Sequence, residues 1–134
     1  MSKILGSYVL ETSHNFDEFM KALGVGLVTR KLANATSPTI IFTEKDGVYN
    51  MKTVSTVKSY DISFKIGVEF DELASDGRKC KTTFTKDGDN KLIQVQKAEN
   101  GKDAKYVREF TDTHLNLTCD CDGVECKRTY KRKD

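Results

Sequence analysis

The chain has 134 residues, enough for one domain with a real core or a modest internal cavity. Charged residues make up 31% of it, yet its formal net charge is only +2, too small to indicate nucleic-acid binding. No apolar run approaches the roughly 18 residues of a membrane span, and the first eight residues lack the apolar core of a signal peptide. We therefore expect a single domain, residues 1–134, in the cytoplasm with its four cysteines reduced.

A strand is predicted near residues 5–13, and a short helical segment follows it. The apolar side chains of a first helix share one face: Phe16, Phe19, Met20 and Leu23. Asn15 is its expected N-cap, Gly24 allows a turn, and a second short helix is predicted over 27–35, before Pro38. These helices are expected to form a lid, about residues 16–35, packed on the rim of a β-structure.

From Thr39 onward the dominant period is two, and Asp-Gly or Asn-Gly pairs separate many of the alternating segments. The predicted strands lie near 39–44, 48–54, 60–65, 69–73, 79–86, 91–97, 104–111, 114–121 and 124–131. Together with the first strand this makes about ten short strands joined by hairpins. Closure removes exposed strand edges, so the pattern predicts an all-β fold: a ten-stranded antiparallel up-and-down barrel capped by a helix-turn-helix.

The register of the last three strands follows from their turns, taken as loops at 112–113 and 122–123. It places Arg108, Leu117 and Arg128 in one row across three strands. The face that carries this row is otherwise mostly apolar and must be the interior; it also presents Phe110, Leu115, Cys119, Cys126 and Tyr130. Two arginines therefore point inward, about 10 Å apart at their Cα atoms for a strand spacing of about 4.8 Å.

A buried, unpaired guanidinium costs several kcal/mol, and arginine cannot lose its proton to escape the cost. No Asp or Glu lies on the inward face of these three strands. One interpretation is that a carboxylate from another strand, or ordered water, satisfies the arginines. The other is that the anion is the head group of a ligand, held by Arg108, Arg128 and the Tyr130 hydroxyl. The second interpretation predicts a carrier of an acid-headed lipid.

Several motifs resemble those of the cytosolic fatty acid-binding proteins, in order and spacing, from about Leu5 to Arg132. They are Gly6-x-Tyr8-x-Leu10, Asn15-Phe16-Asp17-x-Phe19-Met20-x-x-Leu23, Gly24-Val25-Gly26, Thr29-Arg30-Lys31, Phe64-Lys65-x-Gly67-x-Glu69-Phe70-Asp71-Glu72, Asp76-Gly77-Arg78-Lys79, Val107-Arg108-Glu109 and Arg128-x-Tyr130. The resemblance implies a calycin-like barrel with a water-containing cavity. In the heart, adipocyte and myelin branch it implies that Arg108, Arg128 and Tyr130 hold the ligand carboxylate.

The resemblance also implies a portal formed by the second helix and two turns, near 57–58 and 75–76. The residues expected to line the cavity or the portal are Phe16, Met20, Ala33, Pro38, Thr53, Val57, Lys58, Ser75, Asp76, Phe110, Leu115, Leu117 and Cys119. Val57 replaces a portal phenylalanine found in many members of the family. This change affects gating and chain-length preference and leaves the carboxylate residues intact.

The predicted function is that of an intracellular, monomeric carrier that binds a long-chain fatty acid, with no cofactor and no nucleic-acid partner. The sequence has no nucleophile elbow, HExxH motif or phosphate loop, so no enzyme activity is expected. Two alternatives stay open: a retinoic acid carrier, because retinoid carriers share the Arg-x-Tyr pair, and a membrane-associated structural lipid-binding protein.

Two weaker patterns concern positive charge on the helices and the cysteines of the last strands. Positive charge at Lys21, Arg30 and Lys31 is expected either to meet anionic membranes transiently or to lie on a solvated helix face. Cys119 and Cys126 are predicted to face each other as reduced thiols rather than zinc ligands, and whether they oxidise is left open.

Overall fold

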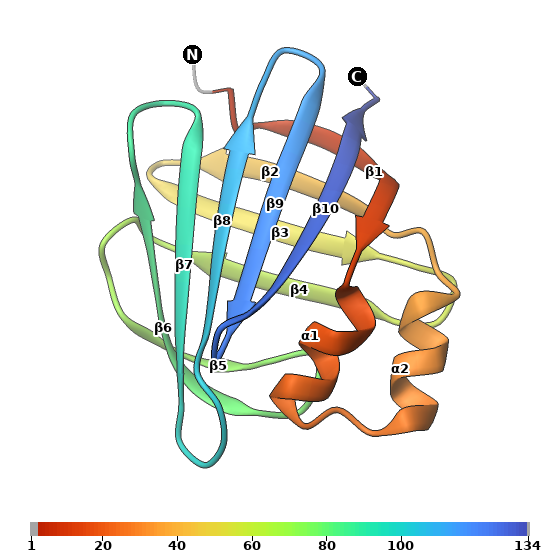
Figure 1. Cartoon of the computed structure of the whole chain (residues 1–134). Coiled ribbons are helices and arrows are strands. Elements are labelled where there is room, and N and C mark those ends of the chain that lie inside the picture. Colours follow the sequence, from red (N-terminus) through yellow and green to blue (C-terminus); the bar gives the residue numbers. More distant parts are fainter. Residues whose placement is uncertain (1–2, 134) are drawn as a thin grey trace.

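Ten antiparallel strands form one sheet that curls into a nearly closed barrel in the computed structural model, which describes residues 3–133 (Figure 1). The strands are β1 (Gly6–His14), β2 (Thr39–Lys45), β3 (Val48–Val54), β4 (Ser59–Phe64), β5 (Phe70–Leu73), β6 (Lys79–Lys86), β7 (Lys91–Ala98), β8 (Ala104–Phe110), β9 (His114–Cys121) and β10 (Val124–Arg132). The two helices are α1 (Phe16–Leu23) and α2 (Leu27–Asn34). The predicted fold class is confirmed, and the strand bounds agree with those from the sequence to within one residue.

The strand order β4-β3-β2-β1-β10-β9-β8-β7-β6-β5 leaves β4 and β5 as the two ends of the sheet. No strand pairing joins these two within residues 3–133. The Tyr60 side chain reaches across the opening instead: its hydroxyl hydrogen-bonds the Glu72 carboxyl group and lies 2.9 Å from the Leu73 carbonyl oxygen. Between β4 and β5, side-chain contacts therefore take the place of a backbone ladder.

The predicted register of the last three strands is confirmed. Arg108 pairs with Leu117, and Leu117 pairs with Arg128 on the next strand. The turn between β9 and β10 explains this register, because Asp122 and Gly123 have φ values of 54° and 84°, the two positive values of a tight type I′ hairpin. A two-residue loop fixes which residues face each other, so the two arginines lie on the same face.

One end of the barrel is packed with aromatic side chains. Tyr8, Phe42 and Phe110 meet edge to face, with ring centroids 5.4 to 6.3 Å apart, and Tyr8 is fully buried. Farther round the wall, the rings of Phe64 and Phe84 stack 3.7 Å apart. We call Tyr8, Phe42 and Phe110 the aromatic plug; they close one end of the barrel. The helices cover the other end (Figure 1).

The helix α1 packs against β10 and β9, and its Phe19 and Met20 side chains are buried. It ends at Gly24, whose φ of 91° is accessible to glycine at little cost. Asn15 is the N-cap of α1, as predicted, but its φ is 65° and its side chain makes no capping bond; its Nδ2 donates instead to the Glu125 carbonyl oxygen at 2.8 Å. The residue thus ties the start of the lid to β10.

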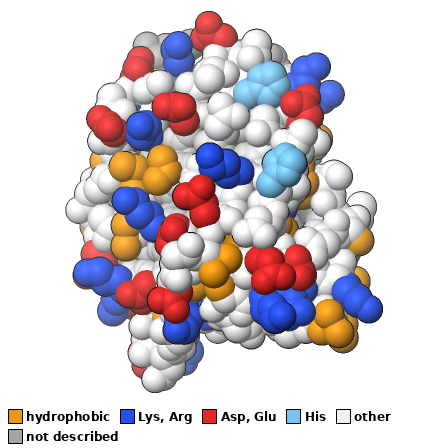
Figure 2. Space-filling view, in the orientation of Figure 1, with side chains coloured by type: hydrophobic (Ala, Val, Ile, Leu, Met, Phe, Trp, Pro, Cys, Tyr) orange, Lys and Arg blue, Asp and Glu red, His pale blue; other side chains and the backbone are white. Residues whose placement is uncertain are grey.

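The helix α2 has no buried residue and lies beside α1 over the barrel opening. An ion pair joins the helices, since Arg30 Nε lies 3.1 Å from Asp17 Oδ1, and Arg30 Nη1 also donates to the Val25 carbonyl oxygen. Leu27, Val28 and Leu32 are exposed, and hydrophobic side chains are visible over α2 at the lower right of Figure 2. None of the helices described is long and apolar enough to cross a membrane.

Candidate functional site

A cavity of about 520 Å³ lies between the aromatic plug and the lid. Its walls come from both helices and from strands on both sides of the barrel, and its volume is in the range of small-molecule sites. The predicted carboxylate residues line it, as do all the predicted cavity and portal residues except Phe110 and Leu115. Those two are buried in or beside the plug. Their inward direction was predictable from the strand register, but that direction does not show whether a residue lies at the packed end of the barrel or along its cavity.

Arg108 is buried, with 5% of its surface exposed. Its Nη1 donates to Gln94 Oε1 at 2.9 Å, and its guanidinium carbon lies 5.5 Å from the Tyr106 ring centroid. Nε of Arg108 is buried without a hydrogen-bond partner among the described residues. Burial lowers the pKa of this guanidinium from its usual value, because desolvation disfavours the charged form. The group is therefore a cation with unused donor capacity inside a cavity.

Arg128, equally buried, faces the same cavity from β10. Its Nε donates to the Tyr130 hydroxyl and its Nη1 to the Ser13 hydroxyl, each at 3.1 Å. The ring of Phe16 covers the guanidinium, with the ring centroid 3.8 Å from Cζ. Burial raises the pKa of Tyr130, so its hydroxyl stays protonated near neutral pH and can donate to an anion. We call Arg108, Arg128 and Tyr130 the head-group site.

No carboxylate of the described chain forms an ion pair with either arginine. The acidic side chain that does lie inside is Glu72 on β5, which is 5% exposed and lines the same cavity. It reaches Arg108 only through Gln94, whose Oε1 accepts from Arg108 and whose Nε2 lies 3.3 Å from Glu72 Oε1. Glu72 is thus the internal carboxylate from another strand that one interpretation predicts, but it is linked to Arg108 through Gln94 and makes no ion pair with either arginine.

Sequence reasoning missed Glu72 as a functional candidate. A cluster forms around it, which we call the Glu72 cluster: Glu72, Tyr60, Thr82, Gln94 and Gln96. The available signal was the alternation of β5, in which Phe70 and Glu72 share the inward face. In a four-residue strand that alternation is too short to distinguish a buried acid from an exposed one.

The two turns predicted to form a portal contact each other. Lys58 Nζ donates to the Ser75 carbonyl oxygen at 2.6 Å, linking the β3–β4 turn to the β5–β6 turn. Val57 is 53% exposed beside it. Behind them Asp76 and Arg78 form an ion pair of 2.6 Å with little solvent exposure. These contacts hold the rim of the cavity under α2 with polar groups rather than apolar packing.

Cys119 and Cys126 face each other across β9 and β10, and both are buried free thiols. The hydrogen bond from the Cys119 thiol to the Cys126 sulfur lowers the pKa of Cys126 and, together with burial, raises that of Cys119. Cys119 also lines the cavity. Within residues 3–133 no group of three His, Cys, Asp or Glu side chains is placed to hold a metal ion.

A ten-stranded barrel with a two-helix lid and an internal cavity defines the class of this protein. Residues 5–133 match the profile of the lipocalin / cytosolic fatty-acid binding protein family, and the chain belongs to that family.

Three relatives illustrate how close the similarity is. The chain is 48% identical to a fatty acid-binding protein of Tyrophagus putrescentiae, over 99% of this chain and 100% of the relative. It is 46% identical to sodium/calcium exchanger regulatory protein 1 of Doryteuthis pealeii, over 98% of this chain and 97% of the relative. The solved structure of a Schistosoma mansoni fatty acid binding protein in complex with arachidonic acid has a TM-score of 0.95 and 39% identity, covering 100% of this chain and 98% of that one.

Proposed function

We propose that this protein is a monomeric cytoplasmic carrier that binds one long-chain fatty acid in its cavity. Arg108, Arg128 and Tyr130 hold the carboxylate, and the alkyl tail extends toward the lid. The observation that carries the proposal is the burial of two guanidinium groups in one cavity, with no directly paired carboxylate among the described residues. A ligand carboxylate supplies the missing anion with charge-assisted hydrogen bonds.

The relatives support the ligand class, because a protein named as fatty acid-binding shares 48% identity over 99% of this chain. The cavity chemistry points the same way. Its apolar wall includes Met20, Ile40 and Met51, which suit an alkyl chain, while Arg108 and Arg128 supply the two cations of the head-group site. We expect no catalysis, since binding and release require no covalent chemistry.

Retinoic acid is an alternative ligand with the same head-group chemistry. The choice between the two depends on tail shape, because a rigid ring system must fit past the lid residues Phe16 and Met20. A membrane-associated structural role is a second alternative. It is disfavoured by the formal charge of +2 and by the use of Arg30 in an internal ion pair with Asp17.

The test has two parts. Native mass spectrometry of the protein purified from its own source should show one acid-headed lipid per chain. Calorimetry of the delipidated protein should show that oleate binds clearly more tightly than methyl oleate, because the ester lacks the charge that the arginines need. Equal affinity for acid and ester would mean that cavity shape alone selects the ligand. Turbidity of anionic vesicles should stay unchanged on adding the protein, whereas a bilayer-bridging protein would raise it.

A further inference from the structure

We infer that Glu72 is a specificity determinant of the cavity: it accepts a hydroxyl group on the ligand's chain and rejects a second carboxylate. The inference rests on the proposed function, since it concerns the tail of an acid whose head lies at Arg108 and Arg128. It assigns the ligand class more narrowly, as long-chain monocarboxylic acids, with hydroxylated acids preferred over plain ones.

The Glu72 carboxyl group receives hydrogen bonds unevenly. Oε1 lies 2.6 Å from Thr82 Oγ1, 3.1 Å from Gln96 Nε2 and 3.3 Å from Gln94 Nε2, so three donors converge on one oxygen. Oε2 hydrogen-bonds the Tyr60 hydroxyl alone among the described residues. The acceptor capacity of this buried carboxyl group is thus filled on one side and incomplete on the other.

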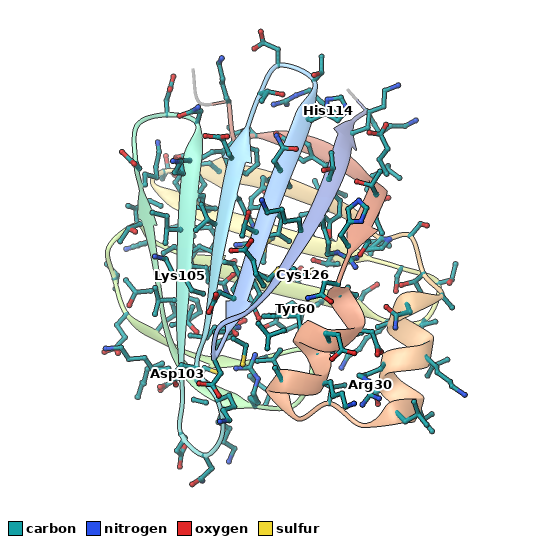
Figure 3. The ribbon with its side chains drawn as sticks, viewed as in Figure 1. Arg30, Tyr60, Asp103, Lys105, His114 and Cys126 are labelled. Atoms are coloured by element: carbon teal, nitrogen blue, oxygen red, sulfur yellow. The ribbon has the colours of Figure 1, made fainter. Side chains whose placement is uncertain are left out.

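The hydrogen bond that Tyr60 gives to Oε2 is also shared with a second acceptor. Its single hydroxyl proton has two acceptors within reach, Glu72 Oε2 and the Leu73 carbonyl oxygen at 2.9 Å. Burial and the neighbouring Glu72 raise the pKa of Tyr60 above its usual value, so the proton stays on the phenol. Figure 3 labels Tyr60 within the outline of the barrel, near the start of α1. If a ligand hydroxyl donated to Glu72 Oε2, the Tyr60 hydroxyl would be free to donate to the Leu73 carbonyl oxygen.

The same carboxyl group repels a second anion. Glu72 and Arg108 line one cavity and are joined through a single side chain, Gln94. In this row of three hydrogen-bonded side chains, Arg108 favours one ligand carboxylate. Glu72 disfavours another, because like charges interact strongly where water is largely excluded. Arg78 offers no alternative site for it, since Arg78 is paired with Asp76 and donates to Gln96. The cavity therefore holds a cationic group, Arg108, and an acidic group, Glu72, separated by one side chain.

Calorimetry with palmitic acid, its monohydroxy positional isomers and the dicarboxylic acid of the same length tests the inference. In the unmodified protein at least one hydroxy isomer should bind about threefold to tenfold more tightly than palmitic acid, the scale of one added hydrogen bond. The dicarboxylic acid should bind at least about tenfold more weakly. In Glu72→Gln both ratios should move toward one.

The matched control is Asp71→Asn, which makes the same change of charge on the residue just before Glu72 in β5. Asp71 points outward, with its side chain 81% exposed, and pairs with Lys81, so both ratios should stay as in the unmodified protein. Each ratio compares two ligands in one sample, which removes any effect of a partly unfolded variant. Tyr60→Phe gives a second test in the opposite direction: within residues 3–133 Tyr60 is the one donor to Oε2, so removing its hydroxyl should increase the preference for the hydroxy acid.

Two results separate this inference from the proposed function. If palmitic acid binds and Glu72→Gln leaves the dicarboxylate penalty unchanged, the role of Glu72 is refuted while the carrier function stands. If palmitic acid does not bind the unmodified protein, the proposed function fails and the inference falls with it. A preference for the dicarboxylic acid in the unmodified protein would also overturn the inference.

Discussion

The ring centroid of Phe16, the first residue of α1, lies 3.8 Å from the guanidinium carbon of Arg128. The start of the lid therefore rests directly on one of the two cations of the head-group site. Movement of α1 away from β10 uncovers the Arg128 guanidinium. An anion that binds this guanidinium in turn alters its contact with the Phe16 ring. The lid and the ligand site share one contact.

Replacing Phe16 with Ala should loosen the lid. The lost cation–π contact is worth about 0.5 to 2 kcal/mol, so oleate should dissociate several-fold faster in stopped-flow displacement. Backbone amides over 16–23 should exchange faster in the ligand-free protein. Leu27→Ala, on the exposed side of α2, is the control and should change neither measurement. An unchanged dissociation rate in Phe16→Ala would show that Phe16 does not hold the lid.

Arg108 should oppose the stability of the ligand-free protein. Its buried Nε has no hydrogen-bond partner among the described residues, and burial disfavours its charge. Arg108→Leu should therefore raise the free energy of unfolding of the ligand-free protein by about 1 to 3 kcal/mol in urea titration, while it weakens oleate binding. Arg30→Leu, which removes the ion pair between the helices, should give no such gain. A less stable Arg108→Leu would mean that its bond to Gln94 outweighs the cost of burial.

Stability should fall at high pH because of three tyrosines. Burial raises the pKa of Tyr60, Tyr106 and Tyr130, and unfolding returns each to a value near 10.0. The protonated form is favoured in the folded state, so their contribution is complete below about pH 10 and is lost as pH rises further. The free energy of unfolding should drop by up to about 1.4 kcal/mol per pH unit for each tyrosine. Ultraviolet titration should show these tyrosines ionising only as the protein unfolds; their ionisation near pH 10 in the folded protein would contradict the burial.

Much of this fold follows from local sequence signals. Alternating apolar residues and the Asp-Gly turns define strands of nearly the correct length, and the turn at Asp122-Gly123 fixes the register that places Arg108 and Arg128 in one row. These features depend on interactions between residues close in the chain or joined by one tight turn. For that reason the arginines were predictable as inward-facing.

The features that sequence reasoning missed depend on contacts distant in the chain. Glu72 becomes part of the cavity through side chains from β4, β6 and β7. Phe110 packs with Tyr8 and Phe42, which places it in the plug rather than along the ligand. Asn15, the predicted N-cap, donates its side-chain amide to the Glu125 carbonyl oxygen on β10 and makes no side-chain bond to its own helix. In each case the partner is set by barrel closure, which no local pattern encodes.

The central claim is that the buried arginines hold the carboxylate of a fatty acid. Its most direct test is to measure the affinities of oleate and oleyl alcohol for the unmodified protein, for Arg128→Gln and for Arg108→Gln. Each substitution should weaken oleate binding by about 10-fold to 100-fold, the scale of charge-assisted hydrogen bonds, and change oleyl alcohol binding by less than about threefold. Equal losses for both ligands, or no loss for oleate, would contradict the account.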